Sequence, residues 1–197
     1  MRVLVSLCDI MSLFENDTAM PLTKEQLEEL ICKIQNKSHR LMIIIGASSG
    51  ITSDELKQIT PDTINYPNQI INIWDKNQNR HRSVYFSENV LKLIKEYEGI
   101  NWNTDGNSFF PFSSQTIELL VKKYCEEILN LNRRWLCIRR SFVSLAADAN
   151  LDIGIVVENS GGKIADVYKY YQKKGIDPIK EINNKPLFNV LQRKLNL

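Results

Sequence analysis

Clusters of lysine and arginine are the residues of this chain that could do chemistry, because cationic side chains bind phosphate. The chain carries 25 Lys and Arg against 23 Asp and Glu, for a net charge of +2. This balance gives no global basic signature, so a nucleic-acid site has to be a local patch. The clusters are Lys37/Arg40, Lys76/Arg80/Arg82, Lys122/Lys123, Arg133/Arg134/Arg139/Arg140 and Lys163/Lys169/Lys173/Lys174.

The fourth of these clusters has the composition of a phosphate-binding surface. Trp135 and Leu136 lie between its arginines, and a mixed basic and aromatic surface suits contact with a nucleic-acid backbone. A solvated cationic face is the alternative. Lys76, among Asn and Gln, is equally consistent with an ordinary turn lysine. Tyr170 and Tyr171, taken alone, are equally consistent with core aromatics whose hydroxyls lie at the rim.

Histidine and cysteine usage disfavours metal and disulfide chemistry. The two His residues, His39 and His81, are too few for a multi-His metal site in one chain. The four Cys residues form no Cys-x-x-Cys pair, so we expect no metal, no cofactor and free thiols in a reducing compartment. We expect small core residues at all four positions: Cys8, Cys32, Cys125 and Cys137.

Length and composition fit one ordinary domain. With 197 residues and 43% hydrophobic content, the chain can bury a core, which excludes wholesale disorder. The longest nearly unbroken apolar run, 41–47, is far shorter than the ~20 residues of a membrane helix, so we expect no membrane partner. A signal peptide is disfavoured because Asp9 interrupts the first apolar stretch.

The elements that must position these side chains are mostly helices. Thr23 and Gln26 have the spacing of a capping box, which predicts a helix over about 24–36, followed by a buried helix over 40–48 and a short helix capped by Ser53. β-forming residues between 63 and 86 predict a small antiparallel sheet. Further helices are expected from Ser87 and over 114–129, 135–149, 152–158 and 163–174. This segregated order predicts a mainly α, α+β domain.

The motifs, taken in order, resemble those of the tyrosine recombinase, or phage-integrase, family. Residues 46–56 resemble the family's Ala-Thr-Gly-Leu-Arg-x-x-Glu-Leu block, and Lys76 lies in the sheet turn where the family keeps a Lys. The segments 82–88, 108–111 and 136–142 are similar to Arg-x-Val-Pro-Leu-Ser, Leu-Phe-Pro and His-x-Leu-Arg-His/Arg-Thr-Phe, and 156–171 resembles the stretch ending in the nucleophilic Tyr. The resemblance covers 22–171 and implies a tyrosine-recombinase catalytic-domain-like helical domain with a small antiparallel β-sheet.

The resemblance also implies a reaction and residues for it. A Tyr hydroxyl attacks a DNA phosphodiester and forms a covalent phosphotyrosyl link, two Arg clamp the non-bridging oxygens, and Lys and His assist proton transfer. On this chain it implies catalytic roles for Arg139, Lys76 and Glu55, although Glu55 also suits the start of a helix. The family spacing reaches Tyr171 when counted from Gly162 and Tyr170 when counted from Gly161; we slightly prefer Tyr171.

Several family groups are replaced in this chain. Thr52 stands where the first clamp Arg is expected, Leu136 where the first His is expected, and Gly161 or Gly162 where a later His or Trp is expected. Loss of one clamp Arg costs on the order of 10³–10⁵ in rate. A missing general acid or base costs roughly another 10²–10⁴. We therefore expect lost or weak strand cleavage.

The predicted function is double-stranded DNA binding by a recombinase-like domain with a degenerate active site. Its alternatives are an active recombinase, in which Arg40, Arg80 or Arg134 replaces the missing clamp, and a non-catalytic protein-interaction module. DNA contacts are expected from Arg139, Arg140, Lys76, Arg80, Arg82, Arg134 and Lys163.

The expected organisation follows the limits of the resemblance. Residues 1–21 form an N-terminal arm or remnant linker, 22–180 the integrase-catalytic-like domain, and 181–197 a tail that is exchanged between protomers. Because so little precedes the domain, a clamp around DNA is expected to need a homo-oligomer or a full-length recombinase partner. We expect action in the cytoplasm or at the nucleoid, with a virus or mobile element as the source.

Overall fold

The computed structural model describes residues 18–101 and 108–173, so the predicted arm up to residue 17 and the predicted tail 181–197 lie outside it. Within the described residues, helices pack against one face of a three-stranded antiparallel sheet, and the mainly α, α+β class predicted from sequence is confirmed. None of the helices in these ranges is both long and apolar enough to cross a membrane.

Two helices with side-chain caps open the described chain. In front of α2 (Lys24–Lys33), Thr23 Oγ1 accepts from the Gln26 amide and Gln26 Oε1 accepts from the Thr23 amide, which confirms the capping box. The predicted helix ran to 36, but Asn36 instead begins a second helix, α3 (Lys37–Ser49), by accepting from the His39 amide. Helix α3 is buried along much of its length, as predicted, and ends at Gly50 with φ of +70°.

The sheet follows the short helix α4 (Ser53–Leu56) and the 3₁₀ turn η1 (Pro61–Thr63). Strands β1 (Ile64–Asn65), β2 (Ile70–Asp75) and β3 (Arg80–Tyr85) pair in that order, and Ile73 lies opposite Arg82. Residues that alternate along a strand share one face. The buried face of β2 and β3 therefore carries Ile71, Ile73 and Val84 together with two charged residues, Asp75 and Arg82.

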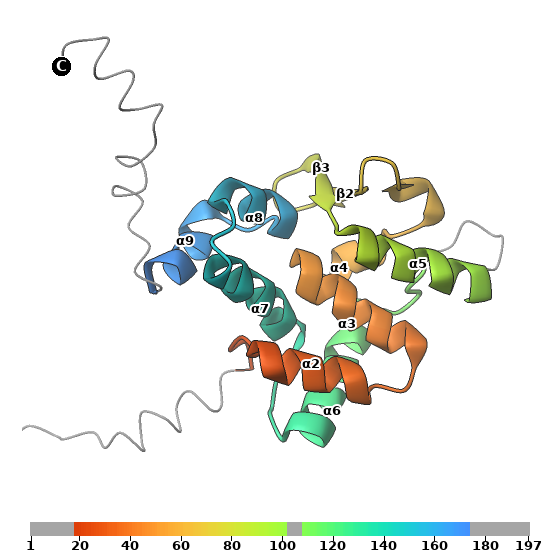
Figure 1. The fold of residues 1–197 in the computed structure, drawn as a ribbon, viewed down its shortest axis with the longest axis horizontal. Coiled ribbons are helices and arrows are strands. Elements are labelled where there is room, and N and C mark those ends of the chain that lie inside the picture. Colours follow the sequence, from red (N-terminus) through yellow and green to blue (C-terminus); the bar gives the residue numbers. More distant parts are fainter. Residues whose placement is uncertain (1–17, 102–107, 174–197) are drawn as a thin grey trace, which may run out of the picture.

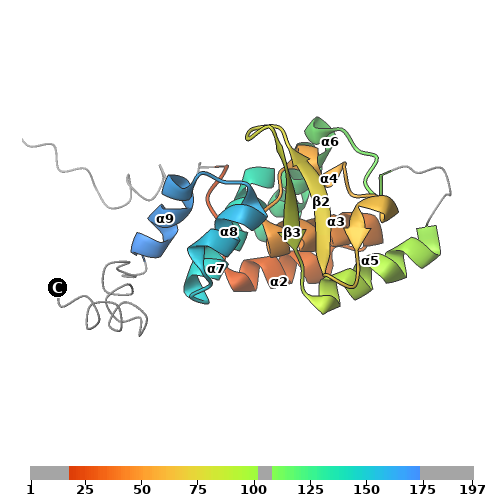
Figure 2. The same ribbon diagram turned by 90° about the horizontal axis from the view of Figure 1, so that it is seen from above.

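Five helices complete the described chain: α5 (Glu88–Asn101), α6 (Ser114–Leu129), α7 (Trp135–Asp148), α8 (Ile153–Ser160) and α9 (Ile164–Lys173). Asn130 ends α6 and Gly161 ends α8, both with left-handed backbone, which is common after the last turn of a helix. Helices α8 and α9 lie together at the end of the molecule opposite α5 (Figures 1 and 2).

The buried apolar residues form two clusters. The larger contains side chains of α2 to α7 and the sheet, from Leu22 to Ile138. The smaller joins the second half of α7 to α8 and α9 and includes Phe142, Val156, Val167 and Tyr171. Helices α8 and α9 are thus attached to the rest of the domain through one end of α7 and, as described below, through polar contacts with β3.

The cysteine predictions were correct in part. Cys125 and Cys137 are buried thiols of the larger cluster. Cys32 is exposed, contrary to the prediction, because Leu27 and Leu30 define the buried face of α2 and a residue two positions beyond Leu30 points away from it. Cys8 lies outside the described residues.

Candidate nucleic-acid interface

A hollow of about 1000 Å³ lies between α7, the α8–α9 turn, α9 and the β2–β3 turn. Its lining is predominantly cationic, because four basic side chains face one acidic side chain, Asp166. The acid is already paired, since Asp166 Oδ1 accepts from Lys169 Nζ at 2.9 Å, and this bond is the main cause of the lowered pKa of Asp166. The basic residues of the lining are Arg139, Arg140, Lys163 and Lys169.

Arg139 and Arg140 come from the middle of α7. Arg139 is half-buried and its Nη2 donates to the Ser160 carbonyl at 2.8 Å, which fixes the guanidinium beside the end of α8. Burial lowers the pKa of Arg139, the nearby Glu55 opposes this effect, and the guanidinium remains charged. Arg140 Nη1 donates to the Ala19 carbonyl at 3.1 Å, so the segment before α2 crosses α7 here.

The β2–β3 turn is shaped by Asp75. Its Oδ1 accepts from the amides of Asn77 at 2.9 Å and Gln78 at 3.2 Å, and Asn79 has a left-handed backbone. Asn77 lines the hollow, whereas Lys76 is exposed beside it and does not line it. The Lys76 charge reaches α4, where it contributes weakly to the lowered pKa of Asp54, after the hydrogen bonds from Lys57 and Ser114.

The two candidate tyrosines occupy different surroundings. Tyr171 is 5% exposed and its hydroxyl donates to the Leu151 carbonyl at 2.7 Å. Burial raises the pKa of Tyr171, which makes its phenolate harder to form. Tyr170 is half-buried and lines the same hollow as Arg139. Family spacing slightly favoured Tyr171 as the nucleophile, whereas in the structure Tyr170, and not Tyr171, lines the hollow.

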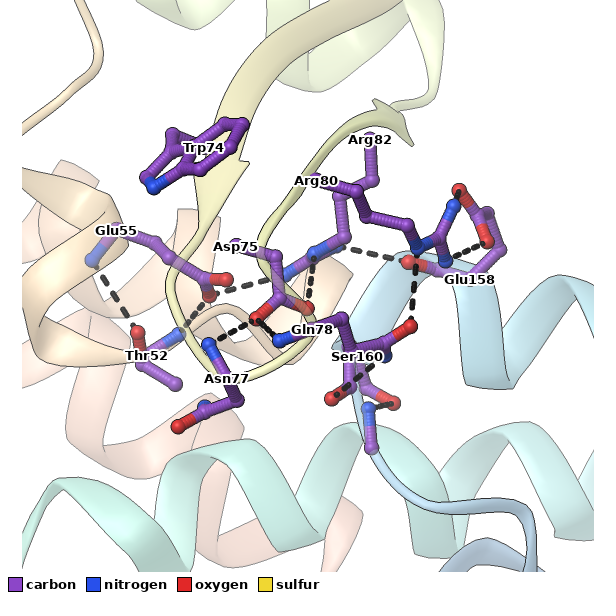
Figure 3. A network of polar contacts seen from close by, with 12 residues as sticks. Thr52, Glu55, Trp74, Asp75, Asn77, Gln78, Arg80, Arg82, Glu158 and Ser160 are labelled. Carbon is purple, nitrogen blue, oxygen red and sulfur yellow. Dashed lines mark hydrogen bonds and ion pairs between the residues drawn. The ribbon is translucent and has the colours of Figure 1, made fainter.

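Arg82, which the sequence analysis placed among the DNA contacts, is buried in this structure and does not face the surface. Its side chain is 0% exposed, with Nη2 at 2.9 Å from Glu55 Oε2 and Nε at 3.5 Å from Asp75 Oδ2. Figure 3 shows the Glu55 and Asp75 carboxylates turned towards this guanidinium. Glu55, predicted as catalytic, is 5% exposed and forms the capping box of α4 with Thr52. Buried ions need such partners because desolvation of an unpaired charge is costly.

The other predicted DNA contacts are dispersed. Arg80 forms a two-pronged pair with Glu158 at 2.7 and 3.2 Å, so its guanidinium is engaged at the surface. Arg134 is exposed at the start of α7 and does not line the hollow, whereas Lys163, just before α9, does. The structure thus brings Arg139, Arg140 and Lys163 together.

The positions at which family groups are replaced lie in or near this site. Leu136, 41% exposed, and Gly161 and Gly162 line the hollow directly. Thr52 does not line it; its hydroxyl accepts from the Glu55 amide and caps α4.

Sequence reasoning missed the polar contacts that join the sheet to α8. Arg82 Nη1 donates to the carbonyls of Glu158 and Asn159, and the Asn159 side chain pairs with both backbone groups of Tyr85. A sequence signal for these contacts was available, because Asp75 and Arg82 lie at the alternate strand positions that otherwise carry buried apolar residues. A charged residue in that phase predicts a buried ion pair.

Comparison with known proteins agrees with this architecture at the level of fold. No protein-family profile and no curated protein sequence matches the chain. Among solved structures, XerA recombinase is 19% identical, with a TM-score of 0.66 over 77% of this chain and 60% of XerA. The Tn1549 transposon integrase, solved with transposon right end DNA, is 16% identical, with a TM-score of 0.67 over 79% of this chain and 62% of the integrase.

A further match is the integrase from mycobacterium phage Brujita, 14% identical, with a TM-score of 0.61 over 80% of this chain and 58% of the integrase. The chain therefore spans about 60% of the length of these structures. At sequence identities of 14–19%, the similarity to these structures concerns the fold of the backbone and not individual side chains. The fold predicted from the motifs is confirmed: the chain has the fold of the tyrosine recombinase and integrase catalytic domain.

Proposed function

We propose that this chain binds double-stranded DNA through the hollow between α7 and α9, with lost or weak strand cleavage. The supporting observation is that one cationic hollow is lined by residues of α7, of the α8–α9 turn and of α9: Arg139, Arg140, Lys163 and Tyr170. Proteins of the same fold, XerH and the Tn1549 integrase, were solved in complex with DNA. A planar guanidinium offers paired donors to phosphate oxygens, which makes Arg139 and Arg140 suitable backbone contacts.

Weak cleavage is proposed because the groups around the hollow cannot provide the full chemistry of phosphodiester attack. Leu136 and the two glycines have no proton to give, and Thr52, engaged in the cap of α4, offers no positive charge. A single clamp arginine, Arg139, then stabilises the charge that develops on phosphate.

If a covalent step occurs, we propose Tyr170 as the nucleophile. Its place in the lining of the hollow supports this choice, as does the engagement of the Tyr171 hydroxyl with Leu151. In that step the Tyr170 hydroxyl gives up its proton to water and its oxygen forms a bond to phosphorus, while the bond to the leaving sugar oxygen breaks and that oxygen takes up a proton from water. Lys76, exposed on the neighbouring turn, is the proposed cationic assistant, and Glu55 is proposed to act only through its buried contacts.

The first experiment tests DNA binding. A fluorescein-labelled duplex is titrated with the full chain at several salt concentrations, and phosphate contacts are expected to give a linear fall of log affinity with log salt. Absence of binding at moderate salt would refute the proposal and favour a protein-interaction module.

A second experiment distinguishes a binding protein from an active recombinase. The chain is incubated with a nicked suicide duplex and examined for a covalent adduct in a denaturing gel. We expect little or no adduct. A strong adduct that disappears in Tyr170→Phe and persists in Tyr171→Phe establishes the active alternative, whereas dependence on Tyr171 contradicts the nucleophile proposed here.

The organisation of the chain is also a proposal. We propose that 22–180 acts as one domain and that a second copy or a full-length recombinase completes the grip on DNA, with the tail exchanged between protomers. Residues 18–22 support continuity with the domain, because the Leu22 amide donates to Ser141 Oγ at 2.7 Å and the Arg134 amide donates to the Thr18 carbonyl at 2.9 Å. DNA as the ligand places the action in the cytoplasm or at the nucleoid; a viral or mobile-element source stays a prediction.

A further inference from the structure

Arg82 is the most completely enclosed cation among the described residues, and its partners come from three other elements. It contacts Glu55 on α4, Asp75 on β2 and the carbonyls of Glu158 and Asn159 at the end of α8. Asp75 lies across the β2–β3 hairpin, whereas Glu55 and the α8 carbonyls are far from Arg82 in the chain. Figure 3 shows three of these partners, Glu55, Asp75 and Glu158, around Arg82.

Each partner adjoins either the lining of the hollow or a position at which the family places a catalytic group. Glu55 holds the Thr52 amide, where the family places its first clamp arginine. Asp75 accepts from the two amides that shape the turn after Lys76. The α8 carbonyls directly precede Ser160, the acceptor for Arg139. A displacement of Arg82 therefore reaches all three parts at once.

The α8–α9 turn packs directly on this ion cluster. Gly161 has φ of +60°, and a Cβ added there would lie 2.8 Å from Asp75 Oδ2 and 2.9 Å from Arg82 Nε. Glycine is required both by the left-handed backbone and by this close approach. The turn that lines the hollow on one side thus rests on the Arg82–Asp75 pair on the other.

Charge provides a second link to the hollow. Arg82 and Arg139 carry two positive charges and Glu55 and Asp75 two negative charges, and Arg139 lies within electrostatic reach of the other three. Without Arg82, Arg139 would remain as a cation that interacts with both buried carboxylates, and Arg80, which interacts with Asp75, is already paired with Glu158. Its guanidinium would then be drawn inwards and would be less available to an external phosphate.

We propose that Arg82 is a positioning residue for the DNA-binding hollow. From the interior it holds together the Lys76 turn, the Thr52 cap and the α8–α9 turn. It also neutralises Glu55 and Asp75, so that Arg139 stays available to phosphate. This role rests on the proposed function of the hollow. Arg82 touches no ligand in it and acts only through these neighbours.

Two variants of the full chain test the proposal. Arg82→Lys keeps the positive charge but loses the fork that reaches several acceptors. Arg82→Met combined with Glu55→Gln keeps the net charge, and the Gln amide oxygen can still accept from the Thr52 amide. The matched control is Glu158→Gln, which breaks the exposed Arg80 pair between the same strand and helix but leaves the Glu158 carbonyl for Arg82.

The first readout is amide hydrogen exchange by NMR, normalised to the buried Ile43 and Ile45 amides so that global unfolding cancels. Both Arg82 variants are expected to speed exchange at Asn77, Gly161 and Gly162 by about tenfold relative to that reference. Glu158→Gln is expected to leave these rates near the wild type. Unchanged rates in both Arg82 variants overturn the proposal, whether or not the chain binds DNA.

The second readout is affinity for the labelled duplex at constant salt, which a purely structural role would leave unchanged in folded variants. Both Arg82 variants are expected to lose about tenfold, corresponding to one phosphate contact. Faster exchange with affinity within about twofold of the wild type shows a structural role only and overturns the positioning role. If the wild type itself binds no duplex, the proposed function fails, and with it the part of this inference that concerns DNA.

Discussion

Arg82 and Arg139 bind successive carbonyls at the same end of α8, and yet they face opposite surroundings. Arg82 donates to Glu158 and Asn159 from the side of the sheet and is enclosed with two carboxylates. Arg139 donates to Ser160 from α7 and opens onto the cationic hollow. Cations suit the C-terminal end of a helix in both cases.

The comparison teaches that direct ion pairs with buried carboxylates, and not the residue type, separate an enclosed arginine from one that faces the hollow. A guanidinium whose charge is balanced inside the protein has little attraction left for a phosphate. A guanidinium at an accessible surface, whose charge is only partly balanced, retains its attraction for a phosphate. Four substitutions examine this difference, and they follow in order of expected effect.

Arg82→Met should cause the largest loss of stability, about 3–5 kcal/mol in the free energy of unfolding, because it leaves Glu55 and Asp75 buried without their main partner. Urea unfolding followed by circular dichroism measures this change. A loss below about 1 kcal/mol would mean that solvent or Arg139 compensates the two carboxylates. Arg82 would then be no more necessary for charge balance than an arginine at the hollow.

Gly161→Ala tests the boundary between the two regions. We expect a loss of about 1–2 kcal/mol from the left-handed backbone, and more from the contact of the new Cβ with Asp75. Gly162→Ala is the matched control, because the φ of Gly162 is not positive and its Cβ would come no closer than 3.1 Å to a neighbouring atom, Ser160 Oγ. Equal melting-temperature shifts for the two variants would contradict a tight packing of the turn on the ion cluster.

Arg139→Met tests the open side. We expect duplex affinity to fall about tenfold, with the slope of log affinity against log salt reduced by about 1. Lys92→Met removes the same charge from α5, at the opposite end of the molecule, and should change neither quantity appreciably (Figure 1). Similar losses in both variants would show that binding depends on overall charge and not on the hollow.

Tyr171→Phe should have the smallest effect, a loss of about 1 kcal/mol for the hydrogen bond to Leu151. Duplex affinity should not change, because Tyr171 does not line the hollow. Thermal unfolding together with the duplex titration measures both. A drop in affinity without loss of stability would contradict the structural role assigned to this hydroxyl.

Much of the fold could be predicted because the governing interactions are local. The Thr23 capping box and the apolar phase of the helices depend on residues three or four positions apart. The error at the end of α2 has a local cause that was overlooked, since Asn36 is a strong helix cap. Cys32 was wrongly predicted to be buried because only its residue type was considered, and not the face of α2 on which it lies.

The site could be predicted less completely. The motif containing Arg139 and Arg140 was located from sequence, and the structure places both at the hollow. Arg82 and Arg80 also belong to a basic cluster, but carboxylates from α4, β2 and α8 engage them. The strand phase of Asp75 and Arg82 predicts their burial, whereas sequence patterns do not show the partners on α4 and α8. For the same reason, counting residues could not choose between Tyr170 and Tyr171, which differ in the direction they face from α9.

From its amino acids alone, this chain specified its element order, the Thr23 capping box and the family whose fold it shares, because these depend on short-range spacing, whereas the caps of α3 and α4, Asn36 and Thr52, were not predicted. Folding in three dimensions determined which cations are neutralised and which remain open to a ligand. The physical reason is that the cost of a charge depends on desolvation and on the ions around it, and residues distant along the chain supply those ions.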